Sequence, residues 1–305
     1  MAYVKFARAN PLAAIQSDAN LEFQRIHEEK LSAAGQIDPE ALASPHDYLA
    51  RQLWQDLRRV LPGEFLNVIG TNFAVGALDN ISVNAVCARS NEGFVVLLIN
   101  AGLMTLLNKI SKLYVAQRIP NSVEYCNRGP GSEVTAAVAR HWSLEVCEHY
   151  RNTGKPLGPQ IHLIASAEPY HSGQLHGWET FVFCHELGHI VAGHLNTREY
   201  WSSDASLGMV ETFKEDESRE MEIEADILGY IMAREYWAKQ SSTGESTAAG
   251  ELDDRFVFGN MTTLFDLLFL LGAGESKSHP NPLDRVCNVA AFVYGDALAE
   301  TVARS

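Results

Sequence analysis

The segment "HELGH" at residues 185–189 constrains the fold more than any other part of the chain. Its two histidines, His185 and His189, are four residues apart, and on an α-helix this spacing brings both imidazoles to one face. Two ring nitrogens can then reach one metal ion. Glu186 is about 100° further round the helix, where its carboxylate can hold a metal-bound water instead of binding the metal. The alternative is a core helix whose histidines are satisfied by hydrogen bonds.

A catalytic zinc ion needs a third protein ligand and an open position for water. His194 is the nearest candidate, but on an unbroken helix it lies about 140° away from His189. We therefore interpret His194 as a helix-end residue. Gluzincin-type metallopeptidases take a glutamate from a second helix, usually with an aspartate four residues later that hydrogen-bonds a ligand histidine. The segment "ESREMEIEADILGY" has that spacing, which predicts Glu222 as the third ligand and Asp226 as the supporting carboxylate.

Neighbouring side chains are weaker candidates for ligands. Glu224 is about 200° from Glu222 around a helix and is expected to point away. Cys184 is about 100° off the face that carries the two histidines. The alternative for the acidic run as a whole is a solvated helix N-terminus, where the helix dipole favours carboxylates. The apolar residues around Asp226 indicate that the helix becomes buried there, which favours a ligand at Glu222.

A third element is "SHPNPLDRV", in which His279 and Arg285 are six residues apart. Its two prolines make a stiff turn, and Asn281 followed by Pro282 predicts the start of a last helix. Taken alone, this segment is also consistent with a helix cap that has an exposed histidine and a surface arginine.

The composition excludes several classes of protein. A hydrophobic content of 46% with 20% charged residues is typical of a folded globular protein. The formal net charge of −14 would repel a phosphate backbone, so nucleic acid is not an expected ligand. The five cysteines are scattered, which favours reduced thiols in a cytosol. We see no secretory signal, and the most apolar segments are too short or too polar to cross a bilayer, so we expect a cytoplasmic protein without membrane insertion.

The predicted elements indicate an α+β fold. Ser44 and Pro45 predict the start of a helix, and "FLNVIG", "ISVNAVCA" and "FVVLLI" predict a small antiparallel sheet. We expect "FVVLLI" to form the edge of a cleft and to hold an extended substrate. Residues 119–132 form the clearest predicted loop. Helices are expected over residues 172–195 and about 217–239.

The predicted domain organisation has two parts. Residues 1–64 form an N-terminal helical segment, and residues 65–305 form the domain that carries the HExxH helix on a small antiparallel sheet. This domain has inserts at about 111–175 and 196–218, and the second of these has no sustained helical or strand period.

The ordered set "HELGHIVAGH", "EIEAD" and "HPNPLDR" resembles the motifs of the HtpX and CAAX-prenyl-protease type of gluzincin metallopeptidase. The upstream segment "ISVNAVCARSNEGFVVLLINAGLMTLL" is similar to that family's strand and Leu-rich helix. In size and layout the chain resembles the soluble Lit-type phage-exclusion peptidases most. The resemblance covers roughly residues 80–110 and 175–300 and lacks the membrane helices of the embedded members, so it does not imply a membrane substrate.

The resemblance implies a zincin-like fold and a catalytic zinc ion held by His185, His189 and Glu222. It implies that Glu186 acts on water, that His279 stabilises the oxyanion, and that Arg285 is an anchoring residue near the cleaved carbonyl. We therefore expect a zinc-dependent endopeptidase that acts on a protein or peptide.

Two other functions remain open from the sequence. One is a highly selective regulatory protease that cuts a single host factor, and the long inserts favour such a restricted cleft. The other is a non-catalytic zinc-stabilised binding module. The presence of Glu186 argues against the module, because a purely structural site usually closes its fourth position with Cys or His.

Overall fold

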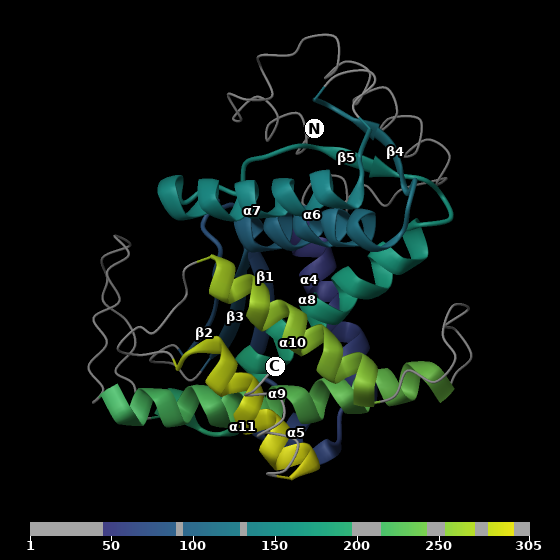
Figure 1. Cartoon of the computed structure of the whole chain (residues 1–305). Coiled ribbons are helices and arrows are strands. Elements are labelled where there is room, and N and C mark those ends of the chain that lie inside the picture. The colour runs from purple at the N-terminus through teal and green to yellow at the C-terminus, as the bar shows by residue number, and fades with distance from the viewer. Residues whose placement is uncertain are drawn as a thin grey trace. The chain divides into compact units, whose positions relative to one another are not determined.

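The computed structural model describes residues 45–89, 94–128, 133–196, 215–271 and 280–295. Over these residues the fold is α+β and mostly helical, with a three-stranded and a two-stranded sheet (Figure 1). The helices are α4 (Pro45–Val60), α5 (Gly63–Ile69), α6 (Ala101–Arg118), α7 (Ala136–Thr153), α8 (Glu168–Val191), α9 (Glu215–Ser242), α10 (Asp254–Leu270) and α11 (Pro282–Tyr294), with the 3₁₀ helix η2 (His194–Asn196) after α8. The strands are β1 (Phe73–Leu78), β2 (Ala85–Arg89), β3 (Val95–Asn100), β4 (Val123–Cys126) and β5 (Ile161–Leu163).

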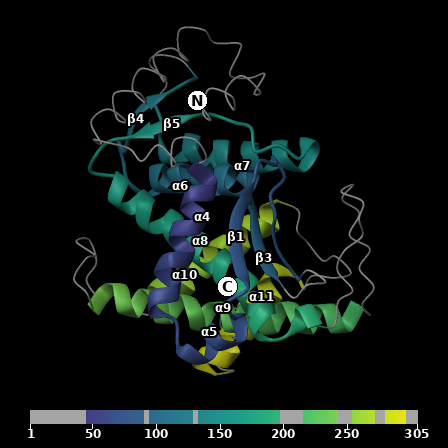
Figure 2. The same ribbon diagram turned by 180° about the vertical axis from the view of Figure 1, so that it is seen from behind.

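The three-stranded sheet has the order β1-β3-β2, and Figure 2 shows β1 beside β3. The prediction that "FVVLLI" forms a cleft edge is wrong, because this segment is the central strand β3, whose residues are largely buried. Among the described strands, β1 and β2 are the edges of this sheet. The edge strand β2 packs against η2, directly after the HExxH helix.

The segment "FLNVIG" was also predicted wrongly, since it belongs to helix α5 and not to a strand. Pro62 precedes the helix, Glu64 lies in its first turn, and Gly70 ends it with φ of +79°. A proline before and a left-handed glycine after a short apolar run are helix boundaries. The strand that does precede β2 is β1, which the sequence prediction missed.

The predicted loop at 119–132 contains a short strand. In its described part, β4 pairs antiparallel with β5, with Tyr125 opposite His162 and Cys126 opposite Ile161. The register shifts between Val123 and Tyr125. A strand of four residues gives too short an alternation to stand out in a sequence beside two prolines and two glycines.

The predicted helices are confirmed within the described residues. Helix α4 begins at the predicted Pro45, while the predicted cap at Ser44 lies outside these residues. Helix α11 begins at Pro282, and the side chain of Asn281 accepts a hydrogen bond from the Leu283 amide at 2.9 Å. Helix α9 contains the predicted range 217–239, whereas α8 ends at Val191, four residues before the predicted end at residue 195.

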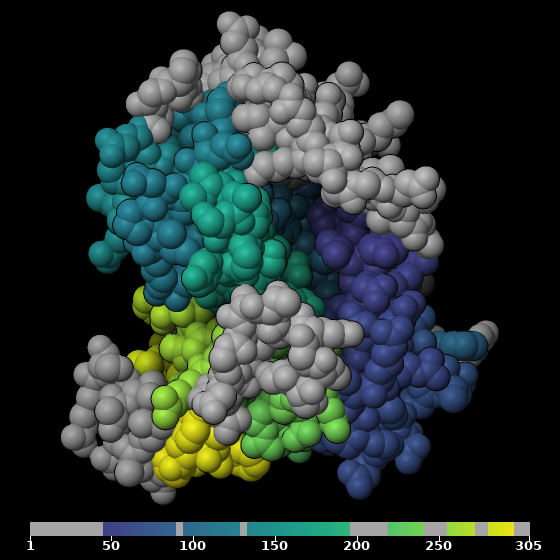
Figure 3. All heavy atoms as spheres, turned by 90° about the vertical axis from the view of Figure 1, so that its right-hand side faces the viewer, coloured from purple at the N-terminus to yellow at the C-terminus, as the bar shows by residue number. Residues whose placement is uncertain are grey.

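The chain divides into two compact units, and the predicted boundary at residue 64 remains a prediction. Residues 45–52, 76–84 and 99–176 belong to one unit, in which α6 packs on α7 and on β5. The described parts of 53–75, 85–98 and 177–295 belong to the other. In this second unit α9, α10 and α11 pack against one another, and Figure 3 shows α9 (green) next to α11 (yellow).

The second unit has an aromatic core around the predicted site. Trp178, Phe183, Tyr230 and Phe265 are almost completely buried. The Trp178 indole N–H donates a hydrogen bond to Thr263 at 3.0 Å, so the polar edge of the ring is satisfied inside the core. This packing fixes α8, α9 and α10, which supply or support the residues of the site.

The cysteines and the hydropathy of the helices can also be compared with the sequence analysis. All five cysteines are free, as their scattered positions predicted. In the described parts of the chain, we find no helix that is both long and apolar enough to cross a membrane.

Candidate metal centre

Two glycines allow helices α8 and α9 to approach closely at the site. A Cβ atom on Gly188 would lie 2.6 Å from the carbonyl oxygen of Ala225, and one on Gly229 would lie 2.9 Å from the backbone nitrogen of His185. Real Cβ atoms essentially never approach other heavy atoms so closely. Gly188, within the HExxH segment, therefore fixes the distance between the two helices that carry the site.

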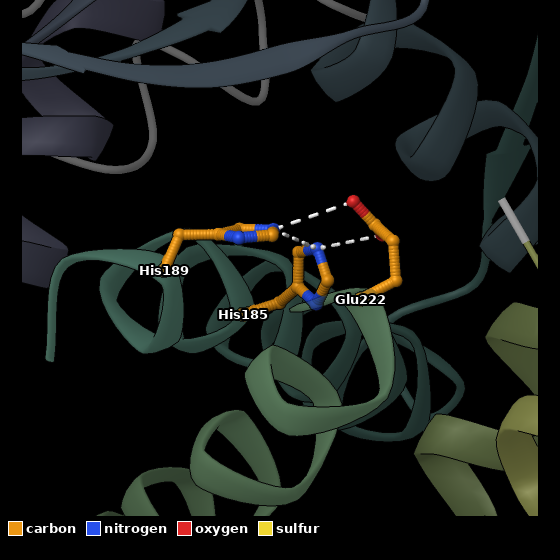
Figure 4. Close-up of side chains that lie close together, drawn as sticks. All are labelled: His185, His189 and Glu222. Carbon is orange, nitrogen blue, oxygen red and sulfur yellow. Dashed lines mark hydrogen bonds and ion pairs between the residues drawn. The ribbon is translucent and has the colours of Figure 1, made fainter. Parts of the chain in front are cut away.

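Three predicted ligands converge across this helix contact (Figure 4). His185 and His189 extend from α8, and their Nε2 atoms are 3.2 Å apart. Glu222 extends from α9, with one carboxylate oxygen 3.5 Å from His185 Nε2 and the other 3.5 Å from His189 Nε2. All three residues are largely buried, so this group could hold a metal ion away from bulk water.

The distances between ligand atoms are close to those of a tetrahedral metal site. At Zn–N and Zn–O bond lengths of about 2.0–2.2 Å, two ligand atoms of a tetrahedron lie roughly 3.3–3.6 Å apart. The two Nε2 atoms are 3.2 Å apart, and each has a different oxygen of Glu222 at 3.5 Å. With one ligand atom taken from each residue, the three atoms lie within 4.8 Å of one another. With both histidines in the Nδ1–H form, lone pairs of His185, His189 and Glu222 face one another, an arrangement that a cation stabilises.

Asp226 supports His185 from behind, as the sequence predicted for a second carboxylate. Its Oδ1 atom is 2.8 Å from His185 Nδ1, and its side chain is completely buried. A carboxylate at Nδ1 holds the proton on that nitrogen and leaves the Nε2 lone pair free for a metal. Glu222 thus belongs to the converging group, while Asp226, four residues later, contacts the opposite edge of the His185 ring.

Arg285 lies in this buried network. Its Nε and Nη2 atoms donate hydrogen bonds to the two oxygens of Asp226, at 2.6 and 2.7 Å. Its Nη2 atom is also 3.4 Å from Glu222. The planar guanidinium thus makes a bidentate contact with a carboxylate, which only arginine provides. The alternative of a surface arginine is wrong, because Arg285 is only 9% exposed.

Charges in the network oppose the effect of burial. Burial alone would lower the pKa of the His185 imidazole, but Asp226 and then Glu222 raise it above its ordinary value of 6.5. Burial alone would raise the pKa of the Asp226 carboxyl, but Arg285 and His185 lower it below 3.8. Asp226 therefore remains charged, and the site favours a positive charge on or beside His185.

Glu186 and His279, the other two predicted site residues, are not part of this buried network as far as the structure describes them. Glu186 is partly exposed and is not one of the three converging residues, as expected for a residue that would act on water. Its charge contributes to the raised pKa of Arg285, after larger effects that include the opposing effect of burial and the attraction of Asp226. His279 lies outside the described residues, so its predicted role stays a prediction.

The sequence prediction missed two residues of the site. His194 Nδ1 lies 2.9 Å from His189 Nδ1, and His194 Nε2 lies 3.1 Å from a carboxylate oxygen of Glu224. The helical extrapolation failed because α8 ends at Val191 and the chain turns at Gly193, which has φ of +78°. A glycine directly before His194 was the signal that the helix ends there.

Comparisons with family models, with curated proteins and with solved structures find no match to this chain. The positions of His185, His189 and Glu222 are therefore the main evidence for a metal site.

Proposed function

We propose that this chain is a zincin-like, zinc-dependent endopeptidase of the gluzincin type, with His185, His189 and Glu222 as metal ligands. The observation that carries the proposal is the convergence of three ligand atoms, one from each residue, to within 4.8 Å of one another, with Glu186 one residue after the first ligand. Two His and one carboxylate leave the fourth position open to water, which is the ligand set of catalytic zinc sites. The resemblance of the three motifs to gluzincins supports the same reaction.

A zinc ion bound there would polarise the substrate carbonyl and lower the pKa of water in the open position. Glu186 would accept the proton of that water and deliver it to the leaving amine. Asp226 keeps the proton of His185 on Nδ1, and Arg285 holds Asp226 in place. The roles of Glu186 as base and of His279 as oxyanion stabiliser are part of the proposal.

The edge strand β2 is the best candidate to hold the substrate. Among the described strands it is at one end of the order β1-β3-β2, and it packs against η2 directly after the HExxH helix. Edge strands can bind an extended peptide by strand addition. A protein or peptide substrate in an extended conformation fits this arrangement.

The proposal is tested with purified protein, zinc and an unstructured substrate such as casein. Glu186→Gln should still bind one zinc ion per chain but should lose cleavage activity by about 10²-fold or more. The matched control is Glu220→Gln, because Glu220 is an exposed glutamate on α9 and should not affect the rate. A Glu186→Gln protein that binds zinc and cleaves at the wild-type rate would overturn the mechanism.

A chelator separates this function from that of a zinc-stabilised module. For a peptidase, removal of zinc should abolish cleavage, and added zinc should restore it. If the chelator unfolds the wild-type protein and no cleavage is seen before its addition, the non-catalytic module is the better account.

A further inference from the structure

The chain leaves α8 in a conformation that brings His194 back to the ligand His189. Helix α8 ends at Val191, and Gly193 adopts φ of +78°, a left-handed conformation that favours glycine. The Gly193 amide donates a hydrogen bond to the Ile190 carbonyl at 3.1 Å, and η2 follows. This turn places two histidine Nδ1 atoms 2.9 Å apart inside the protein, since both side chains are less than 10% exposed.

Glu224 determines the direction of the hydrogen bonds in this contact. Its carboxylate oxygen lies 3.1 Å from His194 Nε2 and can only accept, so His194 carries its proton on Nε2. In the neutral ring, His194 Nδ1 is then an acceptor. The proton between the two rings must therefore belong to His189 Nδ1, and His189 Nε2 presents its lone pair to Glu222.

We propose that His194 and Glu224 are positioning residues that hold His189 in the Nδ1–H form, with Nε2 free for a metal ion. This inference rests on the metal site of the proposed function. It completes the pattern seen at His185, where Asp226 accepts the Nδ1 proton directly. At His189 the carboxylate acts through an intervening imidazole.

Helix α9 then does more than supply one ligand. Glu222 belongs to the converging group, Asp226 holds His185, and Glu224 holds His189 through His194. Successive carboxylates in this set are two residues apart, and Glu224 can serve a different part of the site because His194 lies beyond the end of α8. Outer partners of this kind orient metal-binding histidines and typically change metal affinity by 10–100-fold.

Zinc affinity, measured by competition with a chelator, tests the inference without any substrate. His194→Leu should weaken zinc binding by about 10–100-fold, because the Nδ1–H group of His189 loses its buried acceptor. His194→Asn should retain most of the affinity, because its amide oxygen can occupy the place of Nδ1. Glu220→Leu on α9 is the control and should bind zinc like the wild type.

Nitrogen NMR of ¹⁵N-histidine-labelled, metal-free protein tests the proton position directly. Wild-type His189 should be in the Nδ1–H form, and Glu224→Leu should reduce the population of that form. Glu224 is 59% exposed, so this variant should fold even if His194→Leu does not. The inference is overturned if metal-free His189 carries its proton on Nε2, or if His194→Leu folds and binds zinc as tightly as the wild type. A wild type that binds no zinc would overturn the proposed function. The NMR spectrum would still show whether His194 and Glu224 hold the proton of His189 on Nδ1.

Discussion

Gly188→Ala should damage the metal site more than it damages the fold. The added Cβ would lie 2.6 Å from the Ala225 carbonyl oxygen, whereas ordinary contacts begin at 3.4 Å. Helices α8 and α9 must therefore separate by about 0.8 Å at this point. Overpacking of this kind typically costs about 1–3 kcal/mol of unfolding free energy, and the higher helix propensity of alanine offsets up to about 1 kcal/mol of that.

The effect on the metal site is larger because its ligands come from both helices. Each histidine nitrogen has a different Glu222 oxygen at 3.5 Å, near the longest separation between two ligand atoms of a zinc tetrahedron. A further separation of about 0.8 Å would take the carboxylate beyond the reach of a shared ion, so zinc affinity should fall by at least about 10–100-fold.

The measurements are urea unfolding without metal and chelator competition for zinc. Gly173→Ala is the matched control in the same helix, because a Cβ there meets no atom within 4 Å. This control should be as stable as the wild type or up to about 1 kcal/mol more stable, with unchanged zinc affinity. Equal zinc affinity of Gly188→Ala and Gly173→Ala would show that the close approach of α8 and α9 at Gly188 is not needed for the metal site.

Three further predictions concern buried charges and are checked by urea unfolding. Burial raises the pKa of Glu179 from 4.5 to about 7, so ionisation of this carboxyl lowers the free energy of unfolding as the pH rises through this range. Glu179→Gln should therefore stabilise the protein by about 1–3 kcal/mol at pH 8 and little at pH 4. Burial, with Lys112 and Arg128, lowers the pKa of Lys109 from 10.5 to about 7, so Lys109→Met should stabilise by about 2–4 kcal/mol at pH 6 and less at pH 10. Equal effects at both pH values would contradict either prediction. Arg285→Met removes the bidentate partner of the completely buried Asp226, which keeps only its contact with His185, and should cost about 3–5 kcal/mol; a loss below about 1 kcal/mol would show that the pair is unimportant for stability.

Local periodicity explains which parts of the site could be predicted. His185 and His189 share a helical face because of their spacing, and Glu222 and Asp226 were selected because they share a face at the spacing that gluzincins use. The structure brings all four into one network. What the spacing could not give is the packing between helices, which Gly188 permits by lacking a Cβ atom.

The missed features have specific physical causes. The position of His194 was calculated for a continuous helix, but α8 ends at Val191 and Gly193, with a positive φ, redirects the chain. Arg285 is far from Asp226 in sequence, so no local pattern could show that it binds this carboxylate. The central position of β3 depends on the order of strands in the sheet, which apolar runs alone do not specify.

The most direct test of the central claim is a crystal structure of the zinc-loaded protein with anomalous data at the zinc absorption edge. The account predicts one strong peak about 2.0–2.2 Å from His185 Nε2, His189 Nε2 and a carboxylate oxygen of Glu222, with a fourth position open to solvent. The Nδ1 atoms of the two histidines should keep their contacts with Asp226 and His194. A zinc ion bound at another place, or one with His194 in the position given to Glu222, would contradict the account.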